Sequence, residues 1–241
     1  MSGLLSNPAR PLVASQRWSR SVLVLSALVT VALYAIPEAR VLSYPLVLLS
    51  TLAHELGHGL TAVLVGGQFA SFELYADASG VALTGTSGRL QEVAVLAGGL
   101  IGPSIAAVLL FVMGKTPERA RTCLMLIAAL LAAALLLVVR NMFGWFFIGG
   151  LAAFCALVAW RGPALLSQLV IVFGGTQLAL SVYSRGDYLF TAVAATSAGD
   201  MPSDVAQLST ALLLPYWFWG ALCGAISVAV LLFGVKYYWR S

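Results

Sequence analysis

Charged residues are scarce in this chain of 241 residues. Only 9% of the residues are Asp, Glu, Lys or Arg, while 61% are hydrophobic. A typical soluble domain carries about 25% charged residues. So few charges cannot cover a water-soluble surface, which excludes a soluble enzyme, a disordered chain and a nucleic-acid-binding domain. The sequence therefore predicts an integral, multi-pass membrane protein whose exterior is solvated by the lipid bilayer.

Histidine and cysteine are also scarce, with two and three residues respectively. Cys123, Cys155 and Cys223 lie in separate apolar stretches, so we expect neither a disulfide framework nor a thiolate metal site. Two histidines are too few for the histidine-rich di-iron desaturases and hydroxylases of membranes. The apolar run that begins at Ser21 follows a basic segment and lacks a clear cleavage site, so we interpret it as a signal anchor.

Long apolar runs predict an all-α polytopic fold with about seven transmembrane helices, because each span needs about 20 apolar residues. The run 122–160 is too long for one span and is expected to break near 140–144. We expect residues 1–20 to form a polar, basic tail, 21–235 a single transmembrane domain, and 236–241 a short C-terminal tail. The other expected spans are 21–37, 42–65, 91–113, 164–184 and 208–235.

Two polar stretches interrupt the predicted helices. In residues 67–88, apolar and polar residues alternate on both sides of an Asp77–Gly80 turn signal, which predicts a short membrane-associated β-hairpin. Residues 185–206 form the other polar connection. Because the hairpin is too polar to face lipid, we expect it to lie at the interface or against protein.

The arginines near the N-terminus favour a cytoplasmic start. With seven spans, the second span then runs from outside to inside, and both polar stretches lie on the cytoplasmic side. The cluster of Lys115, Arg119 and Arg121 would fall outside, against the positive-inside rule.

The second expected span contains the sequence His54-Glu55-Leu56-Gly57-His58. On a helix, positions i and i+4 share one face, so both imidazoles can bind one Zn²⁺. Glu55 would stand beside the metal as the catalytic acid/base. An ionisable residue inside a span is costly, which favours a functional over a structural interpretation. We therefore predict His54 and His58 as metal ligands and Glu55 as the catalytic residue.

A catalytic zinc ion takes three protein ligands and a water, so a third ligand is needed. With no third histidine, this ligand should be a carboxylate. Glu73 and Asp77 are expected to face interfacial water, and Glu92 and Glu118 are poorly placed. We predict Asp204 as the metal ligand, with Asp187 as the alternative. The competing interpretations are a helix-capping carboxylate for Asp204 and a solvated loop charge for Asp187.

These features carry a family resemblance that covers roughly residues 42–220. The sequence Ala53–Gly59, followed by Gly66-Gly67, a hairpin and the glycine-rich stretch Gly98–Pro103, resembles the site-2 protease group of the M50 family, most closely its M50B-like branch. Two later segments look like the same branch, Arg140–Trp145 and Ser203–Leu208, the latter ahead of Pro215–Trp217.

The resemblance implies an intramembrane zinc metalloendopeptidase that cleaves transmembrane protein substrates. It also implies the assigned roles of His54, Glu55 and His58. One departure is that the better-known members carry an aspartate in an Asn-x-x-Pro…Leu-Asp-Gly motif, and the nearest match, Asn141–Gly150, has none. We expect the cytoplasmic membrane of a bacterium as the location; no oligomeric state is predicted.

Two alternatives stay open at this point. A catalytically silent membrane homologue could act as a binding or scaffold protein. A metal or small-solute transporter is the other class, although transporters usually show repeated halves and polar residues in several spans. Here the polar residues concentrate at one motif.

Overall fold

The structure is a computed structural model that describes the backbone of residues 9–35, 40–184 and 186–240. Six helices in this part of the chain are long and apolar enough to cross a membrane. The first helix holds a shorter apolar stretch, Arg20–Leu33. The predicted all-α polytopic fold with about seven apolar helices and one hairpin is therefore confirmed.

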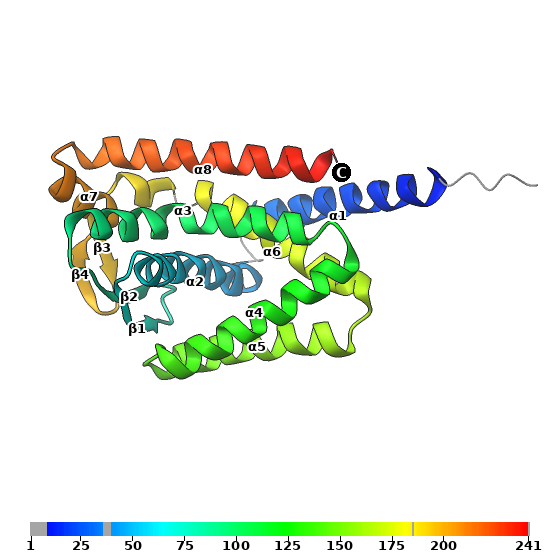
Figure 1. Ribbon diagram of the computed structural model, residues 1–241, viewed down its shortest axis with the longest axis horizontal. Helices are drawn as coiled ribbons and strands as arrows, with labels where there is room; N and C mark the ends of the chain where they lie inside the picture. Colours follow the sequence, from blue (N-terminus) through cyan, green and yellow to red (C-terminus); the bar gives the residue numbers. More distant parts are fainter. Residues whose placement is uncertain (1–8, 36–39, 185, 241) are drawn as a thin grey trace, which may run out of the picture.

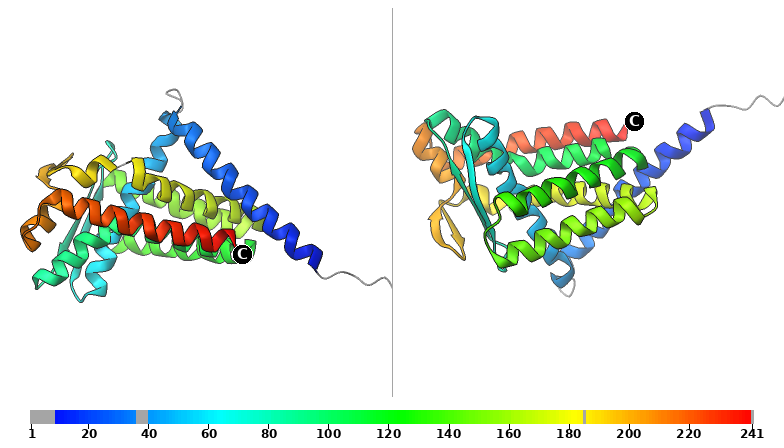
Figure 2. Two further views of the ribbon diagram at one scale, coloured as in Figure 1. Left: turned by 90° about the horizontal axis from the view of Figure 1, so that it is seen from above. Right: turned by 60° about the horizontal axis from the view of Figure 1, so that its bottom comes forward.

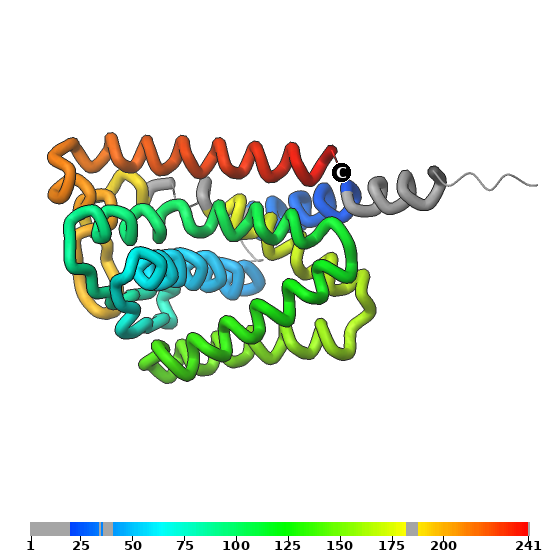
Figure 3. Tube along the Cα trace, in the orientation of Figure 1, coloured from blue at the N-terminus to red at the C-terminus, as the bar shows by residue number. Residues whose placement is uncertain are grey.

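The long helices form one bundle (Figure 1). α3, α6 and α8 lie side by side, α4 and α5 form an antiparallel pair beside them, and α2 crosses the bundle and packs most extensively on α3. Figure 3 shows the same arrangement as a tube along the Cα atoms. The bounds are α1 (Ala9–Ala35), α2 (Arg40–Leu64), α3 (Arg89–Met113), α4 (Pro117–Leu137), α5 (Met142–Arg161), α6 (Ala164–Ser184) and α8 (Tyr216–Trp239).

The predicted hairpin follows α2. Gly66 adopts a left-handed conformation with φ of 81°, which suits glycine and ends the helix. Strands β1 (Gln68–Leu74) and β2 (Gly80–Gly85) then pair antiparallel. In the turn, the Asp77 carboxylate accepts hydrogen bonds from the backbone N–H and the hydroxyl of Ser79, at 2.9 and 2.6 Å. The turn signal in the sequence therefore has the expected structural effect.

The break between α4 and α5 holds the hairpin in place. Val139 forms an isolated parallel bridge with Phe72 of β1, and the Phe72 carbonyl accepts a hydrogen bond from the Arg140 N–H at 3.0 Å. The side-chain amide of Asn141 imitates a strand: its Oδ1 accepts from the Leu74 N–H at 3.2 Å and its Nδ2 donates to the Leu74 carbonyl at 2.6 Å. This contact fixes β1 against the bundle.

The polar connection after α6 is more ordered than the sequence suggested. It contains a 3₁₀ turn, η2 (Gly186–Phe190), a second hairpin of β3 (Val193–Thr196) and β4 (Gly199–Pro202), and a short helix, α7 (Asp204–Leu212). The expectation of one last helix from residue 208 was wrong. Leu213 takes a left-handed conformation with φ of 64°, and Pro215 lacks a backbone donor, so α7 and α8 are separate helices.

Both hairpins and α7 lie at one end of the bundle, away from the C-terminus (Figure 2). The tips of the hairpins touch each other: the Ser197 hydroxyl donates to Asp77 at 2.7 Å, and the Ser197 N–H donates to the Ser79 hydroxyl at 3.2 Å. We call this contact the hairpin latch.

Candidate metal centre

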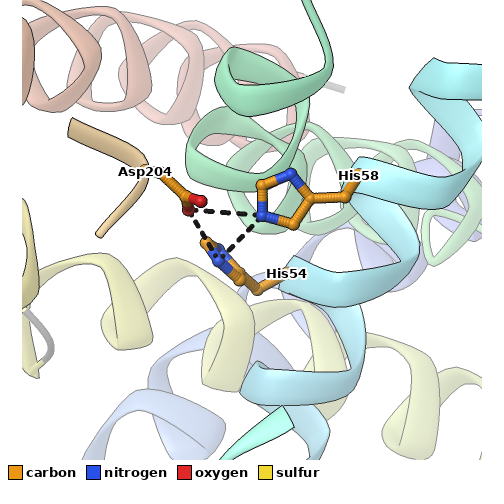
Figure 4. A group of neighbouring side chains, drawn as sticks. All are labelled: His54, His58 and Asp204. Carbon is orange, nitrogen blue, oxygen red and sulfur yellow. Dashed lines mark hydrogen bonds and ion pairs between the residues drawn. The ribbon is translucent and has the colours of Figure 1, made fainter. Parts of the chain in front are cut away.

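Three potential metal ligands meet at the end of the bundle that carries the hairpins (Figure 4). Nε2 of His54 lies 3.2 Å from Nε2 of His58, as expected for imidazoles one helical turn apart on α2. Oδ2 of Asp204 lies 3.0 Å from Nε2 of His54 and 3.2 Å from Nε2 of His58. The three ligand atoms thus form a nearly equilateral triangle.

α7 delivers Asp204 to this point. The hydroxyl of Ser203 accepts a hydrogen bond from the Ala206 N–H at 3.3 Å, so Ser203 is the N-cap and Asp204 is the first helical residue. The same hydroxyl donates to the Thr191 carbonyl at 2.6 Å, which ties the helix start to the second hairpin. Because Ser203 caps the helix, capping does not account for the position of the Asp204 carboxylate.

Hydrophobic packing holds α7 against the bundle. Val205 and Leu208 are buried on one side of the short helix. They join a cluster with residues of α3 and α8: Leu96, Leu100 and Cys223. A helix of this length is marginal alone, so the tertiary contacts stabilise it.

The hydrogen bond made by Nδ1 of His58 determines what its other ring nitrogen, Nε2, can do. Nδ1 lies 2.9 Å from the Val95 carbonyl oxygen, which can only accept, so Nδ1 carries the proton. In the neutral ring Nε2 then presents a lone pair toward His54 and Asp204. In metal sites, the ring nitrogen of a histidine that does not bind the metal commonly donates its N–H to a backbone carbonyl, which orients the ring.

The carboxylate of Asp204 is buried and poorly satisfied. Oδ2 has no hydrogen-bond partner of good geometry among the described residues, although both imidazoles lie within ion-pair distance. Burial alone would raise the pKa of Asp204, but the nearby His58 and His54 outweigh it and hold the pKa well below its ordinary range. The group is therefore a buried anion close to Nε2 of both imidazoles, an arrangement that a cation held between the three groups would stabilise.

The spacing of the three atoms fits a small divalent ion. Around a tetrahedral zinc ion with bonds of about 2.0–2.1 Å, ligand atoms are about 3.3 Å apart. The measured separations of 3.0, 3.2 and 3.2 Å come close to this value. Two imidazoles and one carboxylate are also a known donor set of catalytic zinc sites. The residues present therefore fit such an ion.

Glu55 lies beside the triangle at the wall of two cavities. It is 7% exposed, and Gly80 of β2 packs on it so closely that a Cβ there would lie 2.9 Å from Cγ of Glu55. One cavity, of about 130 Å³, includes all three potential ligands, and the other, of about 270 Å³, lies between the two hairpins and the helices. His54 and Glu55 line both cavities.

Close helix packing makes room for the imidazoles. A Cβ at Gly99 of α3 would lie 2.2 Å from Cε1 and Nε2 of His58. A Cβ at Gly57 of α2 would lie 2.4 Å from the Gly98 carbonyl oxygen. Glycines in membrane helices commonly allow close helix packing. Gly99 does more, because its missing side chain is the space that the His58 ring occupies.

The other carboxylates considered in the sequence lie elsewhere. Glu73 accepts a hydrogen bond from the Tyr75 hydroxyl, and Asp77 belongs to the hairpin latch. Glu92 is an exposed residue of the first turn of α3, and Glu118 lies in the first turn of α4 at the opposite end of the bundle. Asp187 falls in η2, but its side chain lies outside the described part of the chain.

Four residues of the site's surroundings were not foreseen from the sequence. Val95 and Gly99 shape the position of His58, and Ser203 fixes the start of α7. The ring of Tyr188 packs edge-on against His54 at 5.5 Å and lines both cavities. The Ser-Asp pair before an apolar run carried a helix-start signal. The other three contacts are tertiary and leave no local pattern.

A membrane-spanning bundle with a largely buried His-His-Asp triangle beside a glutamate defines a candidate membrane metalloenzyme. The chain belongs to the Peptidase M50B-like family, whose sequence model matches residues 23–234. Searches of curated proteins and of solved structures give no match. Membership in this family suggests a multi-pass membrane metallopeptidase, in agreement with the resemblance seen in the sequence.

Proposed function

We propose that the protein is an intramembrane zinc metalloendopeptidase that hydrolyses peptide bonds in or near the membrane. The observation that carries this proposal is the convergence of His54, His58 and Asp204 on one point directly beside Glu55. Family membership supports the reaction class. In this proposal the two histidines and Asp204 hold the metal, and Glu55 is the catalytic acid/base.

A bound zinc ion would supply a Lewis acid that polarises the peptide carbonyl and makes a water acidic near neutral pH. The carboxylate of Glu55 accepts the proton from the attacking water and later delivers it to the nitrogen of the leaving amine. The Val95 carbonyl keeps the His58 ring oriented through both steps. Gly80 packs against the side chain of Glu55 and thereby restricts its movement.

The larger cavity is suited to a polypeptide. Its wall includes the backbone of β2 at Gly80 and of β3 at Val193–Thr196, together with small side chains. An extended chain can lie beside the strands that border this cavity, and peptide hydrolysis requires an unwound segment whose carbonyl is accessible. The substrate class that fits is therefore a membrane protein with a locally extended segment.

The test compares metal content and cleavage in matched variants. Wild-type protein purified without chelators should hold one zinc ion per chain and cleave a reconstituted transmembrane substrate. Glu55→Gln should retain the metal and lose about 10²–10⁴-fold in rate, because the amide cannot accept the proton. Glu92→Gln, an exposed residue of α3, is the matched control and should behave like the wild type.

The catalytically silent homologue makes a different prediction for the same samples. It expects no cleavage by the wild type under any condition, whether or not metal is bound. Cleavage that is equally fast in Glu55→Gln would instead show that another group is the base. Wild-type protein with far less than one metal per chain would contradict the metal centre itself.

A further inference from the structure

The basic side chains are distributed unevenly between the two ends of the bundle. Away from the hairpins, the described part of the chain places seven basic residues at the helix ends and the turns between them. They are Arg20, Lys115, Arg119, Arg121, Arg161, Lys236 and Arg240. We call this surface the basic end, and the surface with the hairpins and the candidate metal centre the site end.

These residues come from four helices and the turns beside them, and direct contacts show that they share one end of the bundle. Arg121 of α4 donates to the carbonyls of Ala159 and Trp160 at the end of α5. Gln168 of α6 donates to the carbonyl of Lys115 at 3.2 Å.

Arg20 of α1 and the end of α8 join the same surface. The ammonium of Lys115 lies 3.1 Å from the centre of the Tyr237 ring near the end of α8. Arg20 of α1 donates to the carbonyl of Trp239 at 2.9 Å. Arg20 and the end of α8 therefore lie at the same end of the bundle.

The site end carries only two basic residues among the described side chains, Arg89 and Arg140. Arg140 donates to the carbonyls of Val139 and Leu137 at the end of α4. It thus satisfies backbone groups that the helix end would leave unpaired.

Both ends have the aromatic side chains that are enriched at membrane interfaces. Trp145 and Trp217 are about half exposed near the starts of α5 and α8, at the site end. Trp160, Tyr237 and Trp239 are exposed near the ends of the same helices, at the basic end. The two ends are therefore the two membrane surfaces, and the difference between them is their content of Lys and Arg.

We propose that the basic end faces the cytoplasm and that the metal centre opens to the opposite face of the membrane. Short loops rich in Lys and Arg stay on the cytoplasmic side, and the bias is read from loops close to the spans. The turns between α3 and α4 and between α5 and α6 are only a few residues long, so the rule applies to them directly. Among the described side chains, seven basic residues against two give one consistent orientation.

This orientation also resolves the conflict with the positive-inside rule that arose from the sequence at Lys115, Arg119 and Arg121. Counting seven spans from a cytoplasmic N-terminus put Lys115, Arg119 and Arg121 outside. The contact between Arg20 and Trp239 places the start of the apolar stretch Arg20–Leu33 beside the end of α8. Both then lie on one surface, which requires an even number of crossings and agrees with the six helices that are long and apolar enough to span. All seven basic residues can therefore be cytoplasmic together. The site end then lies outside.

The consequence concerns the substrate, and it rests on the proposed function for what the site does. The larger cavity is bounded by η2, β2 and β3 at the site end, and it extends inward to the hydroxyl-bearing residues Ser50, Ser181 and Ser227 of three helices. A substrate must therefore present its extended segment from the non-cytoplasmic half of the membrane. The substrate class is a membrane protein cleaved near its non-cytoplasmic boundary.

Two variants, each with one added cysteine, test the orientation in intact cells. Ala198→Cys places a thiol on the exposed tip of the second hairpin, and Glu118→Cys places one on the exposed start of α4. The native cysteines are buried, so the wild-type chain is the background control. A membrane-impermeant maleimide should label Ala198→Cys from outside, and should label Glu118→Cys only after the membrane is permeabilised.

The opposite pattern, with Glu118→Cys labelled in intact cells and Ala198→Cys protected, overturns the proposal. Labelling of both positions in intact cells indicates a mixed orientation and overturns it as well. Because labelling requires neither metal nor turnover, the result is independent of the proposed peptidase activity. A Glu55→Gln background should give the same labelling pattern as the native chain.

Discussion

The two halves of the candidate metal centre depend on the sequence in different ways. α2 supplies His54, Glu55 and His58 within five residues, and the helical repeat alone puts both imidazoles on one face. α7 supplies Asp204 from a distant part of the chain through a short helix held by one serine and a small hydrophobic cluster. The first half is a local property of one helix, whereas the second depends on tertiary structure. The α7 half should therefore be easier to displace without destroying the fold.

The largest expected effect is the loss of metal when a ligand is removed. His58→Ala should lower metal affinity by more than about 100-fold, because removal of merely supporting residues already costs about 10–100-fold. Asp204→Ala should have an effect of the same size if α7 provides a true ligand. Metal content and competition with a chelator measure both.

Asp200→Ala is the control for the charge of Asp204, since Asp200 is an exposed residue of the second hairpin. It should leave metal affinity unchanged. Should Asp204→Ala bind metal as tightly as Asp200→Ala, the α7 half would not belong to the metal centre, and Asp187 would become the candidate.

The next effect tests the space that α3 leaves for His58. In Gly99→Ala the new methyl group would overlap the imidazole, so the ring or the helix must shift, at a cost of about 1–3 kcal/mol for overpacking. We expect metal affinity to fall about tenfold or more. Gly150→Ala in α5 is the matched control, because a Cβ there meets no atom within 4 Å.

Comparing the two variants separates a local steric effect at His58 from the general effect of a Gly→Ala substitution on folding. Alanine is a better helix former than glycine, so Gly150→Ala should be neutral or slightly stabilising. Equal metal affinities for Gly99→Ala and Gly150→Ala would contradict the steric role of Gly99. Thermal unfolding of the two metal-free proteins would show whether Gly99→Ala also weakens the contact between α2 and α3.

A smaller effect is expected from the cap of α7. Ser203→Ala removes the acceptor for the Ala206 N–H and the donor to the Thr191 carbonyl, and loss of such a cap typically costs about 0.5–2 kcal/mol. Because this cost displaces Asp204, metal affinity should fall several-fold while α2 is unaffected. Ser203→Thr keeps both hydrogen bonds and should restore the affinity.

Ser209→Ala tests whether any serine of α7 would have the same effect. Ser209 lies inside the helix, where alanine is favourable, so this variant should bind metal like the wild type. A Ser203→Ala protein with unchanged affinity would mean that the hydrophobic cluster alone positions α7.

The comparison also explains how much the sequence could predict. The apolar runs, the break near residue 140, the hairpin at Asp77–Gly80 and the His-Glu-x-x-His helix all follow from local patterns, and the structure has each of them. The separate α7 could not be read from hydropathy, because its apolar residues continue into α8. Asp204 was selected by elimination among carboxylates, and only tertiary packing brings it to the histidines.

The second hairpin was missed for a related reason. β3 and β4 are four residues each and mostly small or polar, so their sequence resembles a loop. Their structure depends on contacts at both ends: Ser203 donates its N–H to the Ala192 carbonyl, and Ser197 binds the tip of the first hairpin. Such contacts join residues far apart in the chain and leave no periodic signal.

The smallest expected effect concerns the hairpin latch, which joins the α2 side of the site to the α7 side. Hydrogen bonds from the hydroxyl and N–H of Ser79 and from the Ser197 hydroxyl hold the pKa of Asp77 below its ordinary value of 3.8. A carboxyl group with a lowered pKa in the folded state contributes its stability fully above the ordinary pKa. That contribution is lost as the pH falls through the lowered value. The latch should therefore be closed at neutral pH and loosen only below about pH 4.

A nitroxide attached at Ala198→Cys reports the mobility of the second hairpin tip. In the otherwise native chain, mobility should be low and constant from neutral pH to about pH 4 and should rise only in stronger acid. Asp77→Ala should give the higher mobility at every pH, because the acceptor for Ser197 is gone. Asp200→Ala, on the same hairpin but outside the latch, should keep the native pH profile. If Asp77→Ala and the native chain have the same mobility at neutral pH, the two halves of the site are joined only through the bundle. The second hairpin would then move independently of the first.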